Sequence, residues 1–221
     1  MVGHIERFNP AVCELKRRLE AGELGRVFQV RARRVGPFAQ RQRDVGVVHD
    51  LATHDIDIFR YFLGCEVERV QAETQRAIRT EFEDTLTGLL RFEDGAVGVL
   101  EVNSRTPVKV RELAVLGERG MFVVDYITQE LSFYESDVVG PAQASAGWPT
   151  APGEGVMSAL PVEREEPLRA ELSAFLRVVR ALEPPTVTAD DAITALRVAD
   201  ALVEAARRGE PVRLTAGRAA G

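Results

Sequence analysis

The chain has 221 residues, of which 45% are hydrophobic and 28% are charged, with a formal net charge of −6. This composition is typical of a globular protein and argues against extended disorder. The acidic balance argues against binding to nucleic acid or to a membrane surface, because both need a basic face. We find no secretory leader and no apolar run long enough to span a membrane, so we expect a cytoplasmic protein.

The first third of the chain predicts short elements leading to one central helix. Asn9 is a good N-cap and Pro10 a good first helical residue, and this helix stops at Gly22. The next segment alternates apolar residues with arginines, which is typical of a strand exposed on one face. The expected elements are a strand at 2–5, a helix at 9–22, a strand at 26–35 and the central helix Gly46–Gly64.

The middle of the chain predicts strands in quick succession, at 66–74, 84–92, 96–103, 108–116, 121–126 and 128–134. Glycine-containing turns between them favour antiparallel neighbours. The expected fold is therefore α+β, an open, mostly antiparallel six-stranded sheet with helices packed on one face.

The last third predicts a long loop and two helices. Residues 136–166 have no periodicity and hold the only tryptophan, Trp148, which favours a lid or a partner contact. Helices are expected from Pro167 and over 190–208, the second with Thr188 as its N-cap, and both as covers for the sheet. We expect residues 1–214 to form a single domain, with 215–221 a flexible tail.

The central helix collects polar residues into one stripe. At about 100° per residue, Asp50, His54, Asp57 and Tyr61 fall within an arc of roughly 60°. A carboxylate four residues before an imidazole can orient the ring, which makes His54 a candidate general base. The alternative is a polar stripe on a solvated surface helix. Asp55 lies on the apolar side, where a carboxylate needs a partner.

Arginines are concentrated before the central helix. Asp44 is the only acid in a segment holding Arg26, Arg31, Arg33, Arg34, Arg41 and Arg43. One interpretation is a solvated strand face. The other is a clamp for an anionic substrate, since guanidinium groups bind phosphate or carboxylate with two parallel hydrogen bonds.

Several segments resemble the Gfo/Idh/MocA oxidoreductases over nearly the whole chain. They are GHIERFNPAV at 3–12, ELGRVFQVRARRVGP at 23–37, DVGVVHDLATHDID at 44–57, RELAVLGERGMFVVDY at 111–126 and EPLRAELSAFL at 166–176. Members of this family exchange hydride between a sugar and a nicotinamide held on an N-terminal Rossmann domain. The resemblance implies His54 as the acid-base residue, with Asp50 beside it. Candidate substrate contacts are Arg7, Asn9, Arg34, Arg41, Arg43 and Asp57, and the arginines favour a phosphorylated or nucleotide-linked sugar.

Two motifs of this family are missing. The sequence has no GxGxxG fingerprint, and neither of its lysines, Lys16 and Lys109, lies in a Glu-Lys-Pro context. The family implies NAD or NADP, but the domain that would bind it is missing, so no cofactor-binding residue can be assigned. We expect a substrate and oligomerisation domain that forms a homo-oligomer through its sheet face and is inactive without a separately encoded Rossmann domain.

Two other functions stay open. The first is a non-catalytic assembly module, in which burial of one sheet face is the whole function. The second is a metal-dependent hydrolase using His49, Asp50, His54 and Asp57. It is less favoured, because His49 points away from the polar stripe on a regular helix and because Cys13 and Cys65 show no metal-ligand spacing. We therefore predict no metal site.

Overall fold

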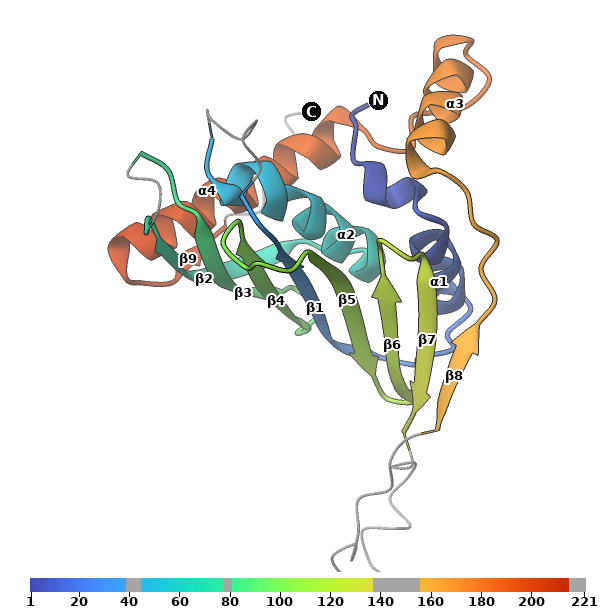
Figure 1. Cartoon of the computed structure of the whole chain (residues 1–221), viewed down its shortest axis with the longest axis horizontal. Coiled ribbons are helices and arrows are strands. Elements are labelled where there is room, and N and C mark those ends of the chain that lie inside the picture. The colour runs from blue at the N-terminus through green and yellow to red at the C-terminus, as the bar shows by residue number, and fades with distance from the viewer. Residues whose placement is uncertain (39–44, 78–80, 137–155, 215–221) are drawn as a thin grey trace, which may run out of the picture.

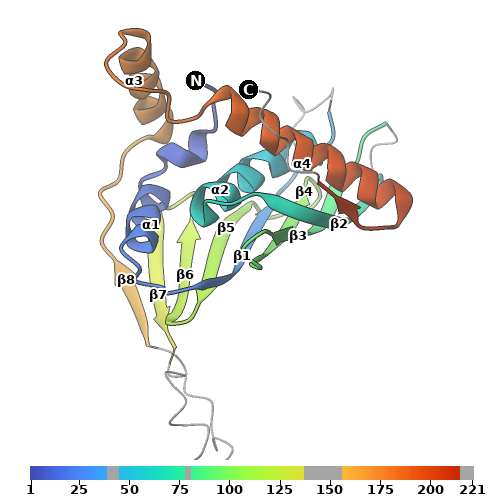
Figure 2. The same cartoon turned by 180° about the vertical axis from the view of Figure 1, so that it is seen from behind.

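The computed structural model describes residues 1–38, 45–77, 81–136 and 156–214, and it confirms the α+β class. A curved, open sheet forms one layer, and helices α1, α2 and α4 lie across one of its faces (Figures 1 and 2). The helices are η1 (Ile5–Phe8, 3-10), α1 (Pro10–Glu20), η2 (Val48–Ala52, π), α2 (Thr53–Leu63), α3 (Pro167–Val179) and α4 (Ala189–Arg208). None of these described helices is both long and apolar enough to cross a membrane.

The sheet holds nine strands within the described residues, in the order β8-β7-β6-β5-β1-β4-β3-β2-β9. Every neighbouring pair is antiparallel except β1 with β4. The strands are β1 (Val27–Val35), β2 (Val67–Gln75), β3 (Thr85–Phe92), β4 (Val97–Asn103), β5 (Val110–Gly117), β6 (Gly120–Asp125), β7 (Glu130–Glu135), β8 (Met157–Leu160) and β9 (Val212–Arg213).

The six predicted strands are β2 to β7, and the sheet is larger than six for two reasons. The separately predicted strand at 26–35 is β1, which pairs between β4 and β5 in the middle of the sheet. The short strands β8 and β9 lie at the two edges of the sheet, and each pairs with one neighbour, β8 with β7 and β9 with β2. The prediction of a loop over 136–166 is wrong at its C-terminal part, because β8 lies there. Residues 137–155 of that loop, including Trp148, lie outside the described residues.

Strand β1 separates its arginines onto two faces. Arg31 and Arg33 point to the outer face, where they form ion pairs across neighbouring strands with Glu112 (3.6 Å) and Glu101 (3.1 Å). Arg34 points to the inner face and is buried among the helices. The interpretation as a solvated strand face therefore holds for Arg31 and Arg33 and fails for Arg34.

Helix α2 is positioned by both of its ends. At the start of the π-helical turn η2, the backbone carbonyl of Glu83 accepts a hydrogen bond from Val47 N (3.1 Å). The carboxylate of Glu83 accepts a second one from Val48 N (3.3 Å). The helix ends, as predicted, at Gly64, whose φ of 66° is the left-handed conformation that glycine adopts without strain. Between these ends Phe59 is fully buried and lies against Gly98 of β4.

The two C-terminal helices have different environments. Helix α4, capped by Thr188 as predicted, lies along β2 and buries Leu202 against Gly88. Helix α3 instead packs against η1, where Ala174 joins Phe8 and Val187 in a small separate cluster, and it projects away from the sheet (Figures 1 and 2). The prediction that both helices cover the sheet is right for α4 and wrong for α3.

The prediction of a strand at residues 2–5 is also wrong. His4 and the residues after it form the 3-10 turn η1, closed by hydrogen bonds from Arg7 N to the His4 carbonyl (3.1 Å) and from Asn9 N to the Glu6 carbonyl (3.2 Å). Helix α1 then begins as predicted, with the Asn9 side chain accepting a hydrogen bond from Ala11 N (3.1 Å). From this turn the side chains of Glu6 and Arg7 reach Arg34 and Asp57 respectively.

Candidate functional site

The two carboxylates at the start of α2, Asp55 and Asp57, are fully buried, and each is held by one arginine. Asp55 accepts from Arg34 Nε and Nη2 of β1, at 2.7 and 2.9 Å. Asp57 accepts from Arg7 Nε and Nη2 of η1, at 2.8 and 2.6 Å. Paired hydrogen bonds of this kind are among the strongest that a carboxylate forms. The prediction that Asp55 must have a partner is confirmed.

A network of charged groups extends from these two pairs. Arg34 Nη2 also contacts Glu6 Oε1 of η1 (3.0 Å), and its guanidinium lies over the ring of Tyr126 (5.3 Å). Arg7 Nη2 lies 3.4 Å from Asp191 Oδ1, in the first turn of α4. The network therefore joins the N-terminal turn, the central strand and the helix layer at one point.

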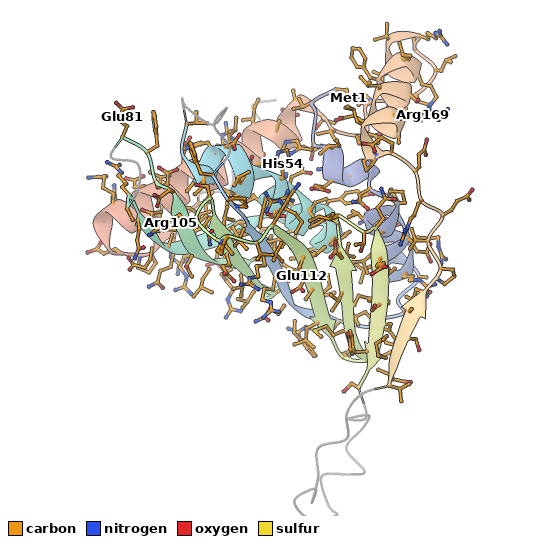
Figure 3. The ribbon with its side chains drawn as sticks, viewed as in Figure 1. Met1, His54, Glu81, Arg105, Glu112 and Arg169 are labelled. Carbon is orange, nitrogen blue, oxygen red and sulfur yellow. The ribbon has the colours of Figure 1, made fainter. Side chains whose placement is uncertain are left out.

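His54 lies on α2 next to Asp55 and is the candidate acid-base group. Burial, and after it the positive charge of Arg34, lowers the pKa of His54 to about 4. Its Nδ1 atom is buried and has no hydrogen-bond partner. The imidazole is therefore neutral at pH 7, which is the form that accepts a proton. Figure 3 labels His54 in the upper part of the view, where Met1 also lies.

Asp50 has a different position from the one that a regular helix predicts. It lies inside the π-helical turn η2, where backbone hydrogen bonds run from residue i to i+5, so the usual i, i+4 alignment with His54 does not apply. The charged groups that most affect His54 are Arg34, Asp55, His4 and Asp57. The pairing of Asp50 with His54 stays a prediction.

The other predicted site residues that the structure describes form contacts within the fold. Arg7, Arg34 and Asp57 are held in the buried ion pairs described above. Asn9 caps α1 and donates from Nδ2 to the Tyr126 carbonyl (3.0 Å). Arg41 and Arg43 lie outside the described residues. A direct contact of any of these side chains with substrate stays a prediction.

Three further residues of the site were not singled out from the sequence: His4, Glu6 and Tyr126. The ring of His4 lies 5.8 Å from that of His54, at an interplanar angle of 78°. Tyr126 is buried with its hydroxyl unpartnered, and burial raises its pKa well above the usual value. His4 and Glu6 belong to the first family-like segment and Tyr126 ends the fourth, which was the signal available in the sequence.

The residues proposed for a metal-dependent hydrolase do not come together. Among the described residues, no three or more His, Cys, Asp or Glu side chains are grouped so that they could hold a metal ion. His49 Nε2 instead contacts Asp200 Oδ1 of α4 at 2.8 Å. No observation in this part of the chain favours the hydrolase.

Comparison with known proteins agrees with this geometry. Residues 12–123 match the family model described as the GFO/IDH/MocA C-terminal domain, so the chain belongs to the Gfo/Idh/MocA family. Scyllo-inositol 2-dehydrogenase (NAD(+)) of Bacillus subtilis is 27% identical to it over 99% of this chain and 63% of the relative. UDP-N-acetylglucosamine 3-dehydrogenase of Acidithiobacillus ferrooxidans is 28% identical over 83% of this chain and 54% of the relative.

Solved structures give the same fold. The A. ferrooxidans UDP-N-acetylglucosamine 3-dehydrogenase superposes with a TM-score of 0.78 at 25% identity, over 93% of this chain and 62% of that structure. An oxidoreductase domain protein from Kribbella flavida superposes with a TM-score of 0.80 at 16% identity, over 98% of this chain and 66% of that structure. The chain spans less than two thirds of the length of the B. subtilis and A. ferrooxidans relatives. Its homologues are NAD(P)-dependent sugar and sugar-nucleotide dehydrogenases.

Proposed function

We propose that this chain is the substrate-binding and oligomerisation domain of an NAD(P)-dependent sugar or sugar-nucleotide oxidoreductase, with residues 1–214 as one domain. The observation that carries the proposal is the neutral imidazole of His54, whose Nδ1 atom is buried, next to two buried arginine–carboxylate pairs on the helix that carries the family resemblance. Oxidation of a hydroxyl group releases a proton as well as a hydride. His54 is the group that takes this proton, and it returns the proton when the carbonyl is reduced.

The dinucleotide itself does not fit the residues of this chain. The sequence has no GxGxxG fingerprint, and the only parallel strand pair of the described residues is β1 with β4, whereas a dinucleotide-binding unit needs several parallel strands and a glycine-rich turn. We therefore propose that NAD or NADP binds to a separate Rossmann domain and that the chain alone is inactive.

Helix α3 offers a surface for that domain. Leu168, Leu172, Phe175 and Leu176 are 43% to 54% exposed on this one helix, and soluble proteins seldom leave such a cluster uncovered. Met1 packs against the small cluster that anchors α3, so the helix lies beside the N-terminus. More than a third of each relative's length lies outside the part that matches this chain. We propose the Rossmann domain as the occupant of this surface.

The outer face of the sheet supports association between copies of the chain. Leu89 of β3 and Leu116 of β5 are 48% and 40% exposed there, among the ion pairs of Arg31 and Arg33. Sedimentation of the chain at micromolar concentration tests this, and a clean monomer counts against it. The same face favours the alternative function, a non-catalytic assembly module, in which association is the only activity.

Ligand titration separates the two functions. Isothermal calorimetry compares a uridine diphosphate sugar with the matching neutral sugar and with inositol. We expect saturable binding, and we expect the anionic sugar nucleotide to bind most strongly. Fluorescence titration with NADH and NADPH is expected to give none. Association without binding of any sugar would favour the assembly module, and tight dinucleotide binding by the chain alone would contradict the need for a separate domain.

A further inference from the structure

His4 is a buried histidine that the proposed proton transfer does not use. It is 8% exposed, in the turn that leads into η1, and this turn fixes its backbone through hydrogen bonds to Val2 O and from Arg7 N, both 3.1 Å long. Its ring packs edge-on against that of His54, with centroids 5.8 Å apart. The N-terminal segment therefore brings a second imidazole to the candidate acid-base group from outside α2.

The surroundings of His4 favour its neutral form. Burial lowers the pKa of His4, the charges of Arg7 and Arg60 lower it further, and those of Asp57 and Asp191 raise it. Asp57 Oδ2 is 3.9 Å from His4 Nδ1, beyond hydrogen-bond distance, because Arg7 occupies both carboxylate oxygens. Glu171 of α3 lies against Gly3, the residue before His4, and burial raises the pKa of this carboxyl.

The two imidazoles share one unusual feature, which is that the Nδ1 atom of each is buried without a hydrogen-bond partner. Protein interiors seldom leave polar atoms unpaired, so a pair of adjacent ones needs an explanation other than packing. A phenylalanine at position 4 would fill a similar volume without this cost. We interpret the pair as two imidazoles of which one sets the orientation of the other.

We propose that His4 is a positioning residue, whose polar imidazole, in contact with the His54 ring, holds that ring in the orientation that receives a proton from the substrate hydroxyl. This rests on the proposed function of His54. When His54 is protonated, Arg34 of β1 and His4 oppose the new charge, and Asp55 and Asp57 support it. Two charged imidazoles at this separation repel each other, so His4 and His54 do not both carry a proton charge at the same time.

The test is nuclear magnetic resonance of the full chain, which has only three histidines. Carbon-proton spectra of the rings give the pKa of each histidine, and long-range nitrogen-proton spectra give the tautomer. The variants are His4→Phe, which keeps a ring, His4→Gln, which keeps a polar group, and His49→Gln as the matched control on the far side of η2. We expect a single tautomer for His54 in the wild type and in His49→Gln.

In His4→Phe we expect a mixture of His54 tautomers and a raised pKa of His54, because His4 lowers that pKa in the wild type. His4→Gln is expected to restore part of the tautomer preference. A His54 spectrum that is the same in folded His4→Phe as in the wild type would overturn the proposal. This outcome is distinct from failure of the proposed function, in which no sugar binds but the coupling between the two rings is still measured.

Discussion

Arg7 and Asp57 form a two-hydrogen-bond ion pair across 50 residues of sequence, with side-chain exposures of 6% and 0%. The pair connects the N-terminal turn η1 to the N-terminal half of α2, near His4 and His54. A buried ion pair contributes little by itself, but removing one partner leaves the other charge buried and uncompensated. The position of the candidate site therefore depends on this contact.

The first prediction concerns this pair. Asp57→Asn should lower the free energy of unfolding by about 3 to 5 kcal/mol, because it leaves the Arg7 guanidinium without its carboxylate. Urea denaturation measures this. The control is Glu183→Gln, which removes the partner of Arg177 in a pair that is about half exposed and should cause no measurable change. Similar losses in the two variants would show that the buried pair is not a special anchor.

The second prediction concerns the start of the central helix. A Cβ atom at Gly46 would overlap the carboxylate of Glu83, so Gly46→Ala should displace Glu83 from Val48 N and cost about 1 to 3 kcal/mol. A double-mutant cycle with Glu83→Ala tests the mechanism. The cost of Gly46→Ala should be much smaller when Glu83 is already truncated. An additive result would place the cause elsewhere.

Local sequence patterns predicted the elements that local interactions determine. Asn9 and Thr188 cap helices because each lies directly before a helical pattern, and Gly64 ends α2 because glycine adopts a positive φ. The buried carboxylate of Asp55 was predicted to need a partner from its place on the apolar side of the helix. These conclusions needed only residues within a few positions of one another.

The sequence could not predict features that depend on distant contacts. The sequence predicts a strand at residues 2–5, but the segment runs into a tight turn from which Arg7 pairs with Asp57, 50 residues away in the chain. The apolar stripe of α3 was assigned to the sheet because periodicity shows that a face is apolar but not what covers it. Local sequence likewise does not show that Glu83, 35 residues away in the chain, bonds to Val48 N at the start of the π-helical turn that contains Asp50.

The third prediction is a dependence of stability on pH. Because the pKa of His54 is about 4 in the folded chain and 6.5 in the unfolded chain, the unfolded state binds more protons between these values. The contribution is fully present above pH 6.5 and is lost as the pH falls toward 4, by up to about 3 kcal/mol. The carboxyl of Glu6, whose pKa is raised by burial, acts in the opposite direction.

Comparison with His54→Gln isolates the histidine from these other groups. The free energy of unfolding of this variant should fall less steeply than that of the wild type between pH 6.5 and 4. Equal slopes in the wild type and His54→Gln would mean that His54 is not the buried neutral group described above.

The fourth prediction concerns the apolar surface of α3. Leu172→Asp together with Phe175→Asp should leave the melting temperature of the chain almost unchanged, since both side chains are about half exposed. The double variant should lose association with the isolated nucleotide-binding domain of the B. subtilis relative, measured by analytical ultracentrifugation. Ala174→Asp on the buried side of the same helix should instead destabilise the chain. Association that survives the double variant would exclude this surface.

The last prediction concerns the reaction. With a nucleotide-binding domain of a relative fused ahead of Met1, His54→Asn should lower kcat for sugar oxidation by roughly 10²- to 10⁴-fold, the usual effect of removing a general base. The KM should change much less, because the asparagine keeps a polar group of similar size at the start of α2. His49→Asn, one turn away, should leave kcat unchanged. If both variants retain activity while the fused enzyme turns over sugar, the proton must go to another group, and the unpartnered hydroxyl of Tyr126 is the next side chain to replace.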